Sequence, residues 1–180
     1  MKNKNFNIPK GSILSNLKHV KKDEKLYYIL NIDIVQNKFI FFNKLFILYS
    51  KANKLNNSFR LSDFCKIIID VYFDYFKENN LLDENYPEDF ESFLKLKKRG
   101  ILEGMQMYSG MSSKDIYTHT TIKMSEETYK KYIVCIYSYI KAYDSELQYH
   151  YSLRKFMNNI VTFVMKNEGF IKSKCNIWEQ

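Results

Sequence analysis

The stretch from Ser125 to Gly169 constrains the fold more than any other part of the chain, because it contains no proline and no internal glycine. Ser125 followed by Glu126 and Glu127 is typical of a helix start, where a hydroxyl accepts an unpaired backbone N–H and carboxylates face the positive end of the helix dipole. Apolar residues then recur three and four positions apart as far as Gly169, a typical helix C-cap. The pattern predicts one long helix, or two helices with a break near Asp144.

The composition favours long helices throughout. The 180 residues include only 5 glycines and 2 prolines, which leaves few positions for the sharp turns that an all-β fold needs. A chain of this length can bury a core in one domain without disulfides or metal. We therefore predict a mainly α fold, a single-domain bundle of about five or six helices over residues 13–180 with a long C-terminal helix or helix pair. A flexible basic tail at residues 1–12 precedes it.

The segment from Leu26 to Tyr49 allows two interpretations. As a helix, its apolar residues share one stripe; as strands, residues 27–35 and 39–42 flank a possible turn at residues 36–38. The β-branched and aromatic content favours a hairpin, whereas the missing glycine at the turn favours the helix. We prefer the helix; a small hairpin at residues 26–49 would make the fold α+β. Polar residues interrupt the segment too often for a membrane span, which needs about 20 nearly unbroken apolar residues.

Two further helices are predicted before the long C-terminal stretch. Ser62 is a helix N-cap ahead of an amphipathic pattern that ends at Asn79–Asn80. Pro87 marks the first turn of the next helix, which runs into a basic cluster ending at Arg99. The residues from Ser109 to Met124 form the longest polar and irregular stretch, and we predict no regular element there.

The three cysteines, Cys65, Cys135 and Cys175, are far apart in the sequence and form no C-x-x-C motif. The first two lie within apolar helical patterns, so we predict that their thiols are buried. Unpaired thiols are typical of a reducing compartment, and no apolar run follows the first lysines as it does in a secretory signal. We therefore expect an intracellular protein without a metal centre or a cofactor.

Residues 116–119, Ile-Tyr-Thr-His, resemble the nucleophile box of the tyrosine recombinases, in which a tyrosine attacks phosphate. The leucine–glycine–histidine step that this family carries upstream is absent, and the three arginines do not follow its pattern. Other catalytic and nucleotide-binding motifs are absent as well. We assign no family and no catalytic residue. A nuclease-like enzyme using Tyr117, His119 or His150 is a third functional class, behind two kinds of binding protein.

Positive charge is the main functional signal. The net charge is +8, and it is unevenly distributed because residues 61–91 are acidic. Lysine and arginine bind phosphate well, since each neutralised phosphate releases counterions. We predict a non-catalytic protein that binds nucleic acid or a nucleoprotein complex through a lysine-rich surface. The residues predicted to bind nucleic acid are Lys95, Lys97, Lys98, Arg99, Lys130, Lys131, Arg154 and Lys155.

The alternative function is a protein–protein adaptor or inhibitor. Such a protein would use exposed aromatic residues together with the acidic face at residues 61–91. The abundance of Lys, Asn, Ile, Tyr and Phe is typical of an A/T-rich coding sequence, so lysine content alone does not decide between the two functions.

Overall fold

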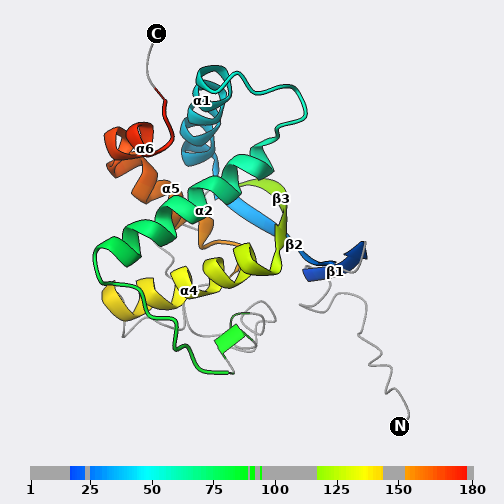
Figure 1. Cartoon of the computed structure of the whole chain (residues 1–180), viewed down its shortest axis with the longest axis vertical. Coiled ribbons are helices and arrows are strands. Elements are labelled where there is room, and N and C mark those ends of the chain that lie inside the picture. The colour runs from blue at the N-terminus through cyan, green and yellow to red at the C-terminus, as the bar shows by residue number, and fades with distance from the viewer. Residues whose placement is uncertain are drawn as a thin grey trace.

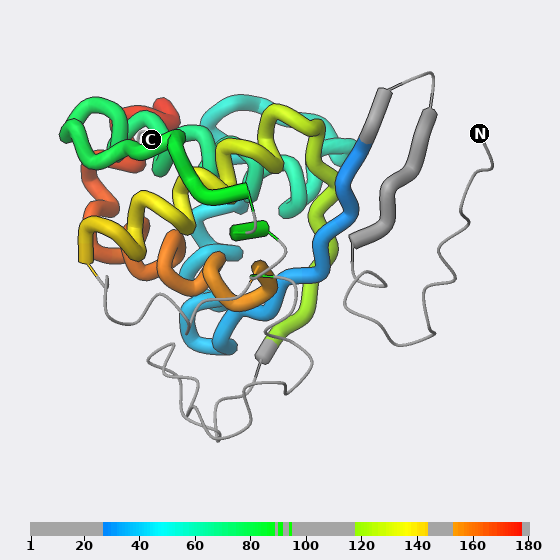
Figure 2. Tube along the Cα trace, turned by 90° about the horizontal axis from the view of Figure 1, so that it is seen from below, coloured from blue at the N-terminus to red at the C-terminus, as the bar shows by residue number. Residues whose placement is uncertain are grey.

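A computed structural model describes residues 17–22, 25–88, 90, 91, 94, 117–143 and 153–177. Within these residues, three strands form one antiparallel sheet, and five helices pack on one side of it (Figures 1 and 2). The fold is therefore α+β. The predicted mainly α bundle is wrong, and the α+β alternative gives the correct class. The predicted tail at residues 1–12 lies outside the described residues.

The sheet joins two distant parts of the chain. Its strands are β1 (Leu17–Lys22), β2 (Lys25–Val35) and β3 (Tyr117–Ser125), in the order β1-β2-β3. Strand β2 is central: it pairs antiparallel with β1 on one side and with β3 on the other. Strand β3 lies mostly within the stretch for which we predicted no regular element. That prediction is wrong because β3 contains three threonines and a histidine, and only part of one of its faces is apolar. Its polar composition therefore resembled that of a loop.

Residues 26–49 contain a strand and a helix, so each interpretation of the sequence was half right. Strand β2 ends at Val35, and helix α1 (Gln36–Ala52) begins at the next residue. The preferred helix is therefore wrong for the first half of the segment, and the hairpin is wrong for the second half. The strand forms because every second residue is buried against the helices and its partners come from outside the segment.

The remaining helices are α2 (Leu61–Glu78), α4 (Glu126–Tyr143), α5 (Met157–Lys166) and α6 (Glu168–Lys174). The predicted bounds of α2 are confirmed to within two residues, but the predicted N-cap at Ser62 is wrong, since Arg60 is the N-cap and Ser62 lies inside the helix. The predicted N-cap of α4 is also confirmed, since the Ser125 Oγ accepts the Thr128 N–H at 3.2 Å. None of the described helices is long and apolar enough to cross a membrane.

The stretch from Ser125 to Gly169 holds separate helices rather than one. Helix α4 ends at Tyr143, and a turn precedes α5. The predicted C-cap at Gly169 is wrong, because this glycine lies inside α6. Asn167 ends α5 instead: its N–H and its Nδ2 both donate to the Phe163 carbonyl, at 3.0 Å and 2.9 Å.

A strand–helix–helix unit occurs twice in the chain, as β2–α1–α2 and as β3–α4–α5. In each unit the first helix begins at the residue after the strand. The central pair of the β2/β3 register is Asn31 and Thr121, which are 90 positions apart. The same offset relates Phe42 to Tyr132, and both are fully buried. The antiparallel pairing thus relates β2 to β3 by a local two-fold axis between Asn31 and Thr121, and the helices follow the two strands in the same order.

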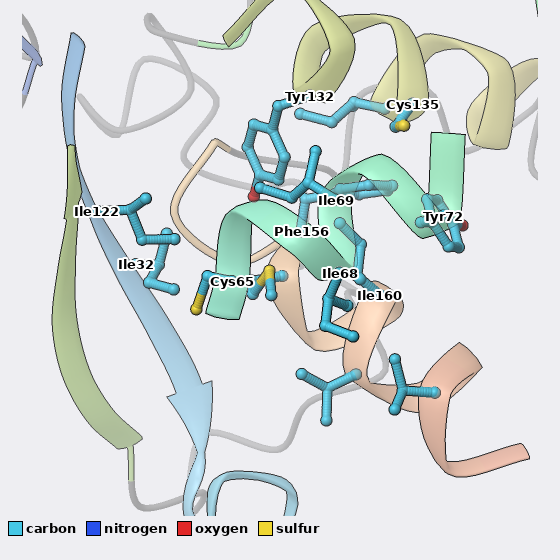
Figure 3. Packing of buried hydrophobic residues seen from close by; sticks show 14 of the residues in the cluster. Ile32, Cys65, Ile68, Ile69, Tyr72, Ile122, Tyr132, Cys135, Phe156 and Ile160 are labelled. Atoms are coloured by element: carbon cyan, nitrogen blue, oxygen red, sulfur yellow. The ribbon is translucent and has the colours of Figure 1, made fainter. Parts of the chain in front are cut away.

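The core lies between the sheet and the helices. Figure 3 shows Ile32 of β2 and Ile122 of β3 facing side chains of α2 and of the segment that leads into α5, including Cys65 and Phe156. Helix α2 crosses the middle of the helical layer and contacts both α4 and β3. The predicted burial of Cys65 and Cys135 is confirmed, since neither side chain is exposed to solvent. The described helices therefore cover one face of the sheet.

Candidate functional site

The face of the sheet that points away from the helices is polar. Alternate residues of β2 and β3 are buried on the helix side, so the intervening residues lie on the opposite face. We call this opposite face the outer sheet face. Its described side chains are exposed on β3 and half-buried on β2, apart from Asp33 and Val35, which are buried. They are those of Tyr27, Ile29, Asn31, Asp33, Val35, His119, Thr121, Lys123 and Ser125.

Three cross-strand contacts organise the outer sheet face. The Thr121 hydroxyl donates to the Asn31 Oδ1 at 2.8 Å. The Lys123 ammonium lies over the Tyr27 ring, 4.1 Å from its centroid. At the other end of the pair of strands, the His119 Nδ1 lies 2.7 Å from an oxygen of Asp33. These contacts hold the polar side chains in defined positions above the two strands.

Asp33 is the buried charge of this face, with 12% of its side chain exposed. A buried carboxylate requires charged or hydrogen-bonding partners. Arg154 supplies one, with its guanidinium NH2 at 2.6 Å from the carboxylate, and His119 supplies the other. The His119 side chain is itself 67% exposed. The imidazole therefore contacts the Asp33 carboxylate through Nδ1, and the rest of the ring is exposed to solvent.

The segment that carries Arg154 also completes the edge of β2. Strand β1 pairs with residues 25–30, and among the described residues no strand lies beside the rest of β2 on that side. There the Asp33 N–H donates to the Arg154 carbonyl at 2.9 Å, and the Asp33 carbonyl accepts from the Asn158 Nδ2 at 2.6 Å. The backbone groups of Asp33 thus point away from β3. The Asp33–His119 pair is therefore of the non-hydrogen-bonded type, in which side chains approach most closely.

The second helices of both units begin next to the sheet. Helix α5 begins beside β2, through the contacts of residues 154–158, and α2 begins beside β3 (Figure 1). Both helix starts carry cations, Arg60 ahead of α2 and Lys155 ahead of α5. Arg60 is exposed and Lys155 is half-buried. A helix N-terminus with a cation attracts anions because its first N–H groups lack intrahelical partners. At the start of α2 the Asp63 carboxylate already accepts the Arg60 N–H, at 3.0 Å.

The predicted lysines of α4 do not lie on this face. Lys130 pairs with Glu126 at 2.8 Å on the surface of α4 itself. Lys131 lies 2.8 Å from Asp70 of α2 and also pairs with Glu127. These two lysines therefore serve contacts within and between helices.

Of the other predicted residues, Arg154 and Lys155 lie beside the outer sheet face. Lys95, Lys97, Lys98 and Arg99 lie outside the residues that the structure describes, as does His150. Sequence reasoning missed Asn31, Asp33, Thr121, Lys123 and Asn158 as members of one site. The available signal was the alternation over residues 117–125, in which Ile122 and Met124 share one face with two threonines.

Exposed apolar side chains gather elsewhere, on α1. Ile40 is 63% exposed and Ile47 is 44% exposed, two turns apart on one face of the helix. Lys44 and Lys51 lie on the same exposed side.

In the described ranges, no group of three or more His, Cys, Asp and Glu side chains could hold a metal ion.

No protein-family model, curated protein or solved structure matches this chain. Its class therefore rests on its own geometry. It is an α+β protein in which two strand–helix–helix units pair through their strands, with a polar outer sheet face between two cationic helix starts.

Proposed function

We propose that this chain is a non-catalytic protein that binds double-stranded DNA, with its outer sheet face in the major groove. The observation that carries the proposal is the antiparallel β2/β3 pair, backed by helices on one side and polar on the other. The major groove of B-DNA is about 12 Å wide and admits a two-stranded β-ribbon. Adjacent strands lie about 4.8 Å apart, so such a pair fits with its side chains facing the base edges.

The outer sheet face offers groups that suit base edges. Lysine binds the guanine O6 and N7 atoms, an asparagine amide matches adenine, and threonine accepts or donates and can contact the thymine methyl group. Lys123, Asn31 and Thr121 are such groups, and Thr121 and Lys123 are exposed. The Asp33 carboxylate would repel DNA by itself, but Arg154 and His119 both contact it.

Phosphate contacts would come from the two helix starts. Arg60 and Lys155 lie at the N-termini of α2 and α5, one in each strand–helix–helix unit. In protein–DNA complexes, helix N-termini and cations commonly bind phosphate and set the orientation of the protein on the duplex. The net charge of +8 supports attraction to a polyanion. The cluster at Lys95–Arg99 remains a predicted source of further phosphate contacts.

Double-stranded RNA is a poorer ligand on this proposal, because its major groove is too deep and narrow for side chains to read. A DNA-binding role also places the protein inside the cell, where three unpaired thiols are stable.

The test is titration of labelled duplex DNA with wild type and two matched lysine variants, at two salt concentrations. Lys123→Ala removes a cation from the outer sheet face and is expected to weaken binding by about tenfold. Lys130→Ala removes an exposed cation from α4 and is expected to change affinity by less than about twofold. Replacing both Arg60 and Lys155 by alanine should reduce the salt slope by about 0.9 for each phosphate that the protein no longer neutralises.

Three outcomes would count against this proposal. Equal losses of affinity in the Lys123 and Lys130 variants would show that the interface is not confined to the outer sheet face. Duplex RNA bound as tightly as DNA would show that the sheet does not bind in the major groove. No binding at low salt would favour the second candidate, a protein–protein adaptor. The exposed Ile40 and Ile47 on α1 support that candidate, because apolar side chains at the centre of an interface contribute most to affinity.

A further inference from the structure

The two ends of the outer sheet face are chemically different although the backbone is nearly two-fold symmetric. The axis between Asn31 and Thr121 exchanges β2 with β3 and maps each residue onto the one 90 positions away. It therefore exchanges the cross-strand pair Ile29–Lys123 with the pair His119–Asp33. One end of the face thus presents an aliphatic side chain and an ammonium, while the other presents an imidazole above a buried carboxylate.

The surroundings of the two ends differ as well. Strand β1 pairs with residues 25–30 of β2, so it flanks only the end that carries Ile29. The axis would place a counterpart of β1 on the outer edge of β3, but none of the described strands pairs there. Residues 154–158 lie on the same edge of β2 as β1, at Asp33 and Val35. Hence neither the side chains nor the neighbouring backbone obeys the approximate symmetry of the strands.

From this we infer that the DNA site of this protein is asymmetric, with two unlike half-sites rather than an inverted repeat. The inference rests on the proposed function and adds the class of sequence that is recognised. Two-fold symmetric proteins bind sites whose symmetry mirrors their own. A single chain with two unlike strands removes that constraint, because the two ends of its outer sheet face present different side chains to the two halves of the site.

The chemistry of each end indicates what each half-site contains. Lys123 favours guanine, whose O6 and N7 accept hydrogen bonds, and Ile29 favours the methyl group of a neighbouring thymine. At the other end Asp33 is buried, so His119 is the group that reaches the groove. A well-placed side chain discriminates between base pairs by roughly 5- to 140-fold, which is enough to separate the two half-sites.

The experiment is a selection from random-sequence duplex DNA with the full chain, followed by titration of three duplexes. These are the selected site and two inverted repeats, each built from one of its halves. We expect a selected site without two-fold symmetry, bound at least about fivefold more tightly than both inverted repeats.

Two variants then assign the halves. Lys123→Thr should relax base preference in one half-site only, and His119→Thr in the other half-site only. Both side chains are exposed, so the variants are expected to fold, and thermal melting followed by circular dichroism checks this. If the His119 variant unfolds because the imidazole no longer pairs with Asp33, Lys123→Thr alone carries the assignment.

The possible failures are distinguishable. Enrichment of an inverted repeat, or a Lys123→Thr variant that relaxes both halves equally, would overturn this inference and leave the proposed function intact. If no duplex is enriched and none is bound at low salt, both the proposed function and this inference are wrong.

Discussion

Asn158 takes the place of a neighbouring strand for Val35. The Asn158 Oδ1 accepts the Val35 N–H at 2.8 Å, and its Nδ2 donates to the carbonyl of Asp33, two residues earlier. The carboxamide thus satisfies one donor and one acceptor of β2, as a backbone amide of a paired strand would. The residues are 123 positions apart, so one side chain ties the start of α5 to the last residue of the central strand β2.

Replacing Asn158 should therefore destabilise the fold strongly. Asn158→Ala leaves a buried N–H and a buried carbonyl without partners, and each costs about 1–3 kcal/mol. We expect a decrease of about 3 kcal/mol in the free energy of unfolding, measured by urea denaturation. The matched control is Asn159→Ala on the next residue of α5, which is half-buried and should cost under about 1 kcal/mol. Equal decreases for the two variants would contradict the role assigned to the carboxamide.

Asp33 and Arg154 should be coupled energetically. Both side chains are largely buried and lie 2.6 Å apart, so removing either one leaves an uncompensated charge. A double-mutant cycle with Asp33→Asn and Arg154→Met should give a coupling energy of about 2 kcal/mol. The exposed pair Glu126–Lys130 is the control and should show a much smaller coupling. Additive effects at Asp33 and Arg154 would show that the ion pair does not stabilise this edge.

Lys131 and Lys123 should separate stability from binding. Lys131 joins α4 to α2 through Asp70 and lies 5.7 Å from the centre of the Phe73 ring. Lys131→Met should lower the free energy of unfolding by less than about 1 kcal/mol and leave DNA affinity unchanged. Lys123→Met should weaken DNA binding and leave the free energy of unfolding unchanged. If a stable Lys131 variant bound DNA more weakly, the result would support the interface on α4 that the sequence alone predicted.

The thiol of Cys65 should respond to pH. Burial raises its pKa from 9.0 to about 12, and burial raises the pKa of the Cys135 thiol in the same direction. In the unfolded chain these thiols lose their protons first, so the free energy of unfolding should fall as the pH rises above about 9. Urea denaturation at pH 8 and pH 10 measures the fall, and Cys65→Ala should make it smaller. Rapid labelling of Cys65 in the native protein would contradict its burial.

The local features of the chain were readable from its sequence. Ser125 was predicted to cap a helix, α2 was placed to within two residues, and Cys65 and Cys135 were predicted to be buried. Each depends on residues within one or two helical turns of each other. Capping, helical periodicity and the burial of an apolar stripe are local properties, so a single sequence is sufficient to reveal them.

The tertiary structure decided the sheet and the candidate site. Strand β3 forms because its alternating pattern finds β2 as a partner, and Asp33, His119 and Arg154 meet although they are 86 and 121 positions apart. The sequence holds no sign of the two-fold relation between the units, because the backbone repeats while the side chains differ. Strand pairing is a contact between distant segments, and its register fixes which side chains share a face. For this reason the residues of the outer sheet face became one surface only when β2 and β3 were paired.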